Sequence, residues 1–273
     1  MHHRRAASPM LVLGLALAAA VPAAGQMRDR PTLMLTIYGG LQTGQGLWTI
    51  GRQPLAVLGY TTFDTLRVSR SVGSGLLAGL HATYFFLPQV GVHAQIGYEG
   101  FPLDDSCALA GGGSYKPDTL GQRNAQLCNN ISGSTVSGGA IHLSGGVVLR
   151  AAARGAVSPY LRAGVGIVNR PQSTVGMAGS YVTNGTIVIR EVISDDSPHR
   201  TSVTAALGIG LTVPLAPGYQ LRFELRDAVS RIERPAGAAN SQADAATEMT
   251  AFNSLGLTVG LDIVLEQKRG RRY

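Results

Sequence analysis

A histidine and a serine stand two residues apart in the segment His142-Leu143-Ser144. In an extended strand such residues share one face, so His142 could act as a general base for the Ser144 hydroxyl. A carboxylate would normally orient the histidine, but the next glutamate along the chain is Glu191, in a predicted loop. We therefore favour two ordinary polar residues over a catalytic pair.

Three histidines could also suggest a metal site. His81, His93 and His142 fall in three separate strand-like segments. Zinc sites need ligands at one point in space, and no acidic residue has ligand spacing to these histidines. Hydrogen-bonded polar side chains are the favoured interpretation, and we expect no metal and no cofactor.

Strand-like segments must position these residues, and segment 219–229, YQLRFELRDAV, shows their pattern most clearly. Tyr219, Leu221 and Phe223 fall on one side, while Arg222 and Glu224 fall on the other. Such alternation is typical of a β-strand with two unlike faces. The segment alone does not tell which face lies inside, because a soluble sheet buries the apolar face and a membrane barrel buries the polar one.

The first residues resemble an export signal. Arg4 and Arg5 precede an apolar run over 10–21, and small residues follow at Ala23 and Gly25. This pattern predicts a signal peptide over residues 1–25. We expect one barrel domain over residues 26–266 and a basic tail over 267–273. The formal net charge is +7, but the basic residues are scattered apart from the tail, so we expect no nucleic-acid partner.

Cys107 and Cys128 are the only cysteines. An even pair in an exported protein predicts a disulfide. It would close a loop of about 20 residues and contribute roughly 3 kcal/mol by loss of chain entropy. The bond could hold a preformed binding loop or protect the loop from proteases, and the second role is favoured.

Eight strands are predicted, and their connections alternate strictly between short and long. The strands are expected over 32–42, 75–86, 90–101, 139–150, 159–169, 202–213, 219–229 and 254–266. The long connections are 43–74, 102–138, 170–201 and 230–253. This alternation predicts an all-β fold, an eight-stranded antiparallel up-and-down transmembrane β-barrel with short periplasmic turns and four long external loops.

The two faces of these strands differ in charge. One face carries no formal charge, as a lipid-facing surface requires, since a lysine or arginine there costs about 2–4 kcal/mol at the bilayer midplane. The other face is rich in glycine, threonine, serine and histidine. Its predicted lumen ionic network consists of Glu99, Arg150, Arg162, Arg222, Glu224, Arg226 and Asp262, with His81, His93 and His142 as lumen histidines. A barrel of eight strands has room for little more than its own side chains, so a plug is favoured over a selectivity filter.

The final predicted strand, LGLTVGLDIVL, completes a resemblance to a known family. Over residues 32–266 the chain resembles the small outer-membrane β-barrels of Gram-negative envelopes, the OmpA-like and opacity-protein-like barrels. The resemblance implies an outer-membrane location, with lipid and lipopolysaccharide as surroundings. It also implies that Gly260, Ile263 and Leu265 form the final-strand signal read by the barrel assembly machinery. Family members usually end on an aromatic residue of that strand, whereas EQKRGRRY follows here.

A second resemblance concerns His142 and Ser144. The pattern His-x-Ser also occurs in outer-membrane lipid A deacylases, which act on a lipid from the outer surface of a barrel. Here both residues fall on the predicted lumen face, which speaks against a lipid substrate.

Four functions follow from these patterns. The leading expectation is a non-enzymatic outer-membrane barrel, a rigid anchor whose loops serve adhesion, surface contact or envelope integrity and meet an extracellular ligand. The alternatives are a narrow channel for small solutes, a lipid A-modifying enzyme, and a soluble secreted binding barrel.

Overall fold

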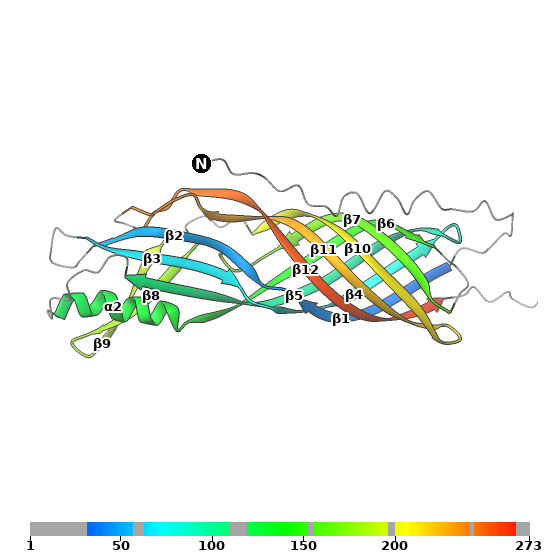
Figure 1. Cartoon of the computed structure of the whole chain (residues 1–273), viewed down its shortest axis with the longest axis horizontal. Helices are drawn as coiled ribbons and strands as arrows, with labels where there is room; N and C mark the ends of the chain where they lie inside the picture. The colour runs from blue at the N-terminus through cyan, green and yellow to red at the C-terminus, as the bar shows by residue number, and fades with distance from the viewer. Residues whose placement is uncertain are drawn as a thin grey trace, which may run out of the picture. The chain divides into compact units, whose positions relative to one another are not determined.

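A computed structural model describes residues 32–56, 63–109, 119–151, 156–195, 200–240 and 243–265 (Figure 1). The predicted signal peptide, residues 1–25, and the predicted basic tail, residues 267–273, lie outside the described residues. The fold below therefore concerns the barrel domain alone.

Eight long strands form a closed antiparallel ring. In chain order they are β1 (Thr32–Gln42), β4 (Gly75–Phe85), β5 (Val90–Leu109), β6 (Thr135–Arg150), β7 (Ser158–Asn169), β10 (Thr201–Ala216), β11 (Tyr219–Pro235) and β12 (Thr247–Leu265). Each pairs with its neighbour in this order, and β1 pairs with β12 to close the ring. The predicted eight-stranded up-and-down barrel is confirmed.

The apolar face of each barrel strand points outward. On β12, Leu257 is 59% exposed, whereas its neighbour Thr258 is 6% exposed and Asp262 is fully buried. Soluble proteins bury leucine and expose aspartate, so this inversion identifies a barrel whose outer surface contacts lipid. On β11 and β12 the outward face first carries polar side chains at Asp227 and Asn253.

Short turns join the strands at one end of the barrel. The β4–β5 turn is closed by a reciprocal pair of main-chain hydrogen bonds between Leu87 and Val90, at 3.2 and 3.3 Å. The β10–β11 turn contains Gly218 at a φ of 82°, a left-handed conformation that glycine adopts without strain. Both turns agree with the predicted short connections.

The four long connections, predicted as loops, contain regular structure. They hold a hairpin of β2 (Gln45–Ala56) and β3 (Phe63–Val72), the helix α2 (Thr119–Ser132), and a hairpin of β8 (Met177–Thr183) and β9 (Thr186–Ile193). In addition, β5, β6, β11 and β12 continue beyond the predicted strand ends, and β3 pairs with the extended part of β5. None of the described helices is long and apolar enough to cross a membrane.

These outer connections share one apolar core. We call residues 43–74, 101–138, 170–201 and 230–253 the cap. Buried residues from each of the four parts lie in a single cluster, which includes Trp48, Leu66, Leu103, Leu127, Met177, Val192, Ile232 and Phe252. Such a shared core makes the cap a folded structure rather than four independent loops.

Helix α2 packs through one face against β8. Leu127 and Ile131, one turn apart, have no exposed surface. A Cβ atom built on Gly179 of β8 would lie 2.8 Å from atoms of both residues, so the glycine permits this close approach.

Candidate functional site

Arg222 and Asp262 form the best-defined ion pair of the lumen. Their strands β11 and β12 are neighbours in the sheet, and both side chains point inward. Arg222 Nε donates to Asp262 Oδ1 at 2.9 Å and Arg222 Nη2 to Oδ2 at 3.1 Å, while the Thr36 hydroxyl donates to Oδ1 at 2.7 Å. A buried carboxylate is thus met by three donors, as charge burial requires.

A second ion pair joins two strands that are not neighbours in the sheet. The strand between them has only glycines at the inward positions that face the pair. Arg162 of β7 pairs with Glu224 of β11, and the Tyr160 hydroxyl donates to the same carboxylate at 2.8 Å. Between them, β10 presents Gly208 and Gly210 at the matching positions. A Cβ atom on Gly210 would lie 2.5 Å from the Tyr160 ring, so the glycines create the space in which β7 and β11 side chains meet.

Glu99 is shared by a histidine and an arginine. Its carboxylate lies 3.4 Å from His142 Nδ1 and 4.0 Å from Arg226 Nη2. The other ring nitrogen, His142 Nε2, lies 3.3 Å from the Tyr38 hydroxyl and 3.0 Å from Gln95 Nε2. His142 is therefore held within the lumen network.

The remaining predicted lumen residues differ in their position. His81 and His93 pack edge to face, with ring centroids 5.1 Å apart, and His81 Nδ1 lies 3.3 Å from Arg222 Nη1. Arg150, predicted as a network member, instead lies at the short-turn end, over the Phe85 ring and bonded to the Pro88 carbonyl. The structure brings six of the seven predicted ions into the central lumen, and Arg150 lies apart from them.

Tyr38 and Gln95 are lumen residues that the sequence interpretation did not single out. Gln95 accepts a hydrogen bond from Arg162 Nη1 at 2.6 Å and donates to the Tyr38 hydroxyl. Their positions on the inward side of the predicted strands 32–42 and 90–101 were the available signal. An uncharged amide and a phenol in this way connect the Arg162 pair to His142.

Little space remains among these side chains. A hollow in the described lumen has a volume of about 10 Å³, and its lining includes Tyr38, Gln95, Arg162 and Arg222. That is room for about one water molecule. Ser144 is buried on the same inward face as His142, away from the apolar outer surface. No cluster of three metal-ligating residues occurs among the described residues.

Polar contacts connect the four parts of the cap. Arg70 donates to both carboxylate oxygens of Asp105, at 2.6 and 2.8 Å, and through Nη1 to the Ser173 carbonyl at 3.2 Å. The Trp48 indole donates to the Thr174 carbonyl at 2.8 Å, and the Thr174 hydroxyl donates to the Glu233 carbonyl at 2.6 Å. Each part of the cap is thereby bonded to another.

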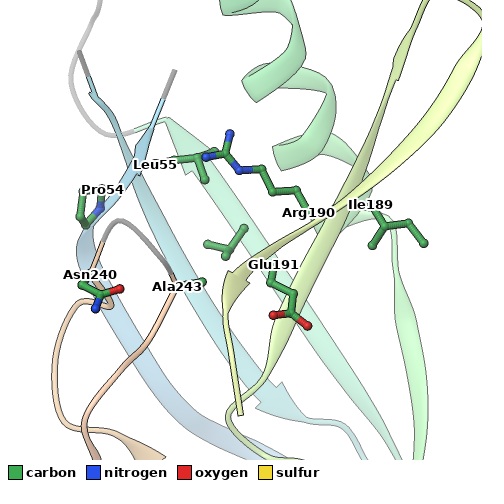
Figure 2. A pocket seen from close by; sticks show the side chains of 8 residues that line it. Pro54, Leu55, Ile189, Arg190, Glu191, Asn240 and Ala243 are labelled. Carbon is green, nitrogen blue, oxygen red and sulfur yellow. The ribbon is translucent and has the colours of Figure 1, made fainter. Parts of the chain in front are cut away.

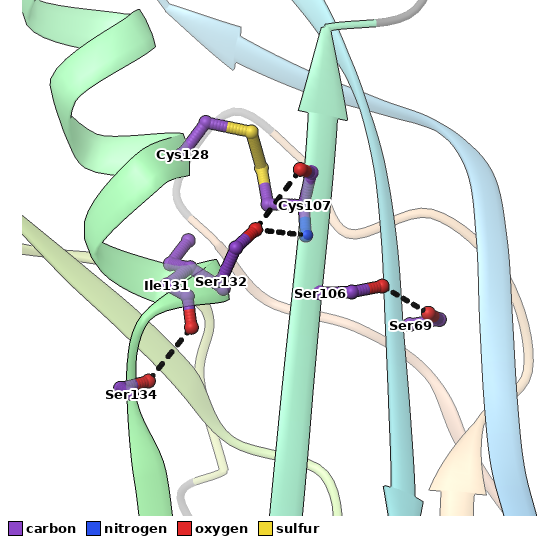
Figure 3. The surroundings of a disulfide bond; sticks show 7 residues. All are labelled: Ser69, Ser106, Cys107, Cys128, Ile131, Ser132 and Ser134. Carbon is purple, nitrogen blue, oxygen red and sulfur yellow. Dashed lines mark hydrogen bonds between the residues drawn. A yellow bond between two sulfur atoms is a disulfide. The ribbon is translucent and has the colours of Figure 1, made fainter.

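Cys107 of β5 and Cys128 of α2 form a disulfide (Figure 3). Beside it, the Ser132 hydroxyl accepts from the Cys107 main-chain N–H at 2.8 Å and donates to the Cys107 carbonyl at 3.0 Å. The end of α2 is thus attached to β5 by the disulfide and by the Ser132 hydroxyl, which hydrogen-bonds to both main-chain groups of Cys107.

A hollow of about 310 Å³ lies among the described residues of the cap. Three segments distant in sequence line it: Pro54 and Leu55 of β2, residues 189–192 of β9, and Asn240 and Ala243 of the last connection (Figure 2). The volume is at the lower end of the range of ligand pockets, about 300–1,000 Å³. The hollow exists only when the cap is folded.

Fold and lumen together define the class of protein. A closed eight-stranded barrel with an apolar outer surface, a buried ionic interior and short turns at one end has the architecture of small outer-membrane β-barrel proteins. Its outward leucines, isoleucines and valines form the apolar surface that a membrane-spanning barrel requires.

Solved structures with similar folds are outer-membrane barrels. Neisserial surface protein A is 10% identical, with 86% of this chain and 99% of that chain covered, at a TM-score of 0.40. OprG from Pseudomonas aeruginosa is 12% identical, with coverages of 89% and 100% and a TM-score of 0.38. Outer membrane protein AlkL is 12% identical, with coverages of 92% and 97% and a TM-score of 0.38. No protein-family model and no curated protein matches the sequence.

Proposed function

We propose that this protein is a non-enzymatic outer-membrane anchor whose plugged barrel presents the cap for contacts outside the cell. The observation that carries the proposal is the single apolar core shared by all four outer connections. Loops that only join strands need no such core, whereas a preformed binding surface gains affinity from being ordered in advance.

The lumen supports the anchor role. A hollow of about 10 Å³ lies among its ion pairs and histidines, and this volume is smaller than a solute path. Within this proposal the network of Glu99, Arg162, Arg222, Glu224, Arg226 and Asp262 has a structural role, and Cys107–Cys128 stabilises the cap. The final strand, with Gly260, Ile263 and Leu265, serves insertion by the barrel assembly machinery, and lipopolysaccharide surrounds the outer part of the barrel.

The charge of the cap favours contacts by shape and hydrogen bonding. Its four segments hold ten arginine and lysine residues against ten aspartate and glutamate residues. A balanced surface lacks the net positive field that would attract a polyanion. The proposed partner is therefore recognised at a defined site rather than by net charge.

Deleting part of the cap tests this proposal. In the variant, the hairpin Met177–Ile193 is replaced by a two-residue turn, and adhesion of expressing cells to surfaces and to other cells is compared with the wild type. We expect adhesion to fall while the barrel still migrates differently with and without boiling in detergent. Unchanged adhesion with an intact barrel would contradict a contact role for the cap.

A narrow channel is the second candidate, and single-channel recording in planar bilayers separates it from the anchor. A plugged lumen gives no steady conductance steps, and Arg222→Ala then adds occasional openings at most. Steady steps in the wild type that change amplitude in Arg222→Ala would establish the channel instead. Lipid A mass spectra with and without Ser144→Ala would be identical if the protein is no lipid-modifying enzyme.

A further inference from the structure

The outward face of β5 continues from the apolar part of the barrel into the cap. Leu103 is buried in the cap core, while Asp104 and Ser106 are exposed on the opposite face of the strand. Figure 3 shows Cys107 turned toward α2 and Ser106 turned toward Ser69 of β3. One side of β5 therefore belongs to the cap core, and the other side extends the outer wall of the barrel.

Small hydroxyl side chains cover this extended wall. Strand pairing arranges them in two rows, one across β2, β3 and β5 and one across β3, β5 and β6 with Asp104 in its middle. The Ser69 and Ser106 hydroxyls are 2.6 Å apart and share one hydrogen bond, so each keeps further donor or acceptor capacity. We call this group the hydroxyl face, and it consists of Thr49, Ser69, Ser71, Ser106, Thr135 and Ser137.

The composition of this wall argues against protein and polyanion partners. The outward positions of β5 from Pro102 to Ala108, and the positions paired with them on β3 and β6, hold no aromatic, leucine, isoleucine or valine side chain. Protein–protein interfaces concentrate such residues at their centre. Among these positions Arg67 and Asp104 carry charge, with opposite signs, so no net field attracts a polyanion. The chemistry that remains is hydrogen bonding to a partner rich in hydroxyl groups.

Tyr98 lies at the transition between the apolar surface and the hydroxyl face. Its neighbours Ile96 and Ile141 are exposed on the lipid-facing side. A Cβ atom on Gly139 would lie 2.7 Å from the Tyr98 hydroxyl oxygen, and one on Gly100 would lie 3.1 Å from the ring. The ring therefore covers this glycine pair, with its hydroxyl toward the cap. Tyrosine suits such a boundary because its body is apolar and its tip is polar.

The height of the hydroxyl face indicates which kind of head group reaches it. Asp104 lies six residues beyond Tyr98. That is about 20 Å along a strand and about 15 Å along the membrane normal at a tilt of about 40°. The head-group layer of a phospholipid is only about 5–8 Å thick. Phospholipid head groups therefore end below Asp104, whereas a head group of several sugars extends to it.

We propose that the hydroxyl face binds the sugar head group of a glycolipid in the outer leaflet of the membrane. The acyl chains pack against β5 and β6 below Tyr98, and the sugars above exchange hydrogen bonds with the serine and threonine hydroxyls. Continuity of the surface identifies this occupant, since a lipid beside Ile96 and Ile141 has its head group beside the same two strands. The inference rests on the proposed anchor role and assigns one side of the anchor to a bound lipid.

Two lipids that differ in their sugars test the proposal with the full chain reconstituted in phospholipid nanodiscs. The probes are lipopolysaccharide that retains its core sugars and lipid A without them, supplied in equal amounts. The glycolipid that stays bound to the released protein is counted by native mass spectrometry. We expect the wild type to retain the core-bearing lipid about tenfold more than lipid A, because only the former reaches the hydroxyl face.

Removal of hydroxyl groups locates the binding. The test variant carries three substitutions that remove hydroxyls of the face with little change in side-chain size, Ser71→Ala, Thr135→Val and Ser137→Ala. The matched control removes three hydroxyls elsewhere in the cap, with Thr183→Val, Thr186→Val and Thr247→Val. We expect the preference for the core-bearing lipid to fall below about twofold in the test variant and to stay near tenfold in the control. Boiling-dependent migration shows that both variants retain the barrel.

The opposite results overturn the site. An unchanged preference in the test variant, or an equal loss in the control, would show that the sugars bind elsewhere. A wild type that retains both lipids equally, or neither, would remove sugar binding altogether. The adhesion assay is separate from these outcomes, because its failure would remove the contact role of the cap without changing which lipid is retained.

Discussion

Asp262 is a carboxylate with no exposed surface in the wall of a membrane-spanning barrel. It accepts hydrogen bonds from Arg222 and from Thr36, and the guanidinium also lies over the Tyr160 ring, 5.0 Å from its centroid. Such a pair contributes little over an apolar replacement, but breaking it leaves a charge buried alone. Replacing both residues by apolar ones should therefore lower the free energy of unfolding much less than removing one charge of the pair.

We expect Asp262→Asn to lower the free energy of unfolding by about 3–5 kcal/mol, because Arg222 loses its countercharge. The measurement is urea unfolding of the protein in lipid vesicles, followed by boiling-dependent migration. The double variant Arg222→Leu with Asp262→Leu serves as the comparison and should recover most of the loss. A single variant as stable as the wild type would show that the pair is not needed for the fold.

For single residues, the sequence predicted which face of the strand a side chain lies on, but not which residue it forms an ion pair with. Period-two alternation predicts that Arg162, Glu224 and Asp262 point inward, and all three side chains are buried. It could not indicate that Arg162 meets Glu224 across β10, because that depends on the strand register and on Gly208 and Gly210. Arg150 is a second residue whose partner the alternation could not indicate. It lies at a strand end, where its side chain bonds to the Pro88 carbonyl in the turn and not to the ionic network.

Glycine positions set how closely the barrel strands approach each other. Two neighbouring glycines on β1 allow this packing effect to be separated from the loss of backbone flexibility that any Gly→Ala change brings. A Cβ atom on Gly40 would lie 2.1 Å from the Leu257 carbonyl oxygen, whereas on Gly39 the nearest atom is 3.8 Å away. We expect Gly40→Ala to destabilise the barrel by about 1–3 kcal/mol through overpacking. Gly39→Ala is the matched control and should change stability by less than about 1 kcal/mol. Equal unfolding midpoints in urea would contradict this reading of the β1–β12 contact.

The disulfide should protect the cap more than the barrel. Arg123 lies in α2, inside the loop closed by Cys107 and Cys128. Loss of the bond removes roughly 3 kcal/mol of chain-entropy stabilisation from this loop. We expect the variant with both cysteines replaced by serine to be cut by trypsin after Arg123 much faster than the wild type, with barrel migration unchanged. Equal cleavage rates would show that the apolar core alone holds α2.

The elements of the cap were partly predictable. Asn184 and Gly185 have φ values of 49° and 73° and form the two-residue turn of the β8–β9 hairpin, a sequence signal that was available. Helix α2 gave a weaker signal, since its 14 residues include a glycine and three asparagines. Among those whose side chains the structure describes, Leu127, Cys128 and Ile131 are the buried apolar ones. The shared core itself depends on contacts between segments far apart in sequence, which local patterns do not contain.

On the scale of the whole molecule, Trp48 reports on the cap alone. It is the only tryptophan of the chain, is 7% exposed, and lies in the cap core. We expect its fluorescence to be insensitive to brominated lipids, because the residue lies outside the apolar belt. On adding urea, its emission should shift to the red at a lower concentration than that at which the barrel loses boiling-dependent migration. Coincident transitions would mean that cap and barrel unfold as one cooperative unit.

Strands β5, β11 and β12 run from the lipid-facing barrel into the cap without interruption, over Val90–Leu109, Tyr219–Pro235 and Thr247–Leu265. This continuity has a mechanical consequence. A tensile load on the cap along these strands would pass directly into the barrel wall, where the hydrogen bonds between neighbouring strands are sheared together instead of being peeled apart one by one. Because these strands continue from the barrel into the cap without a hinge, the cap would not first rotate to align with the load. It would behave as a stiff attachment point.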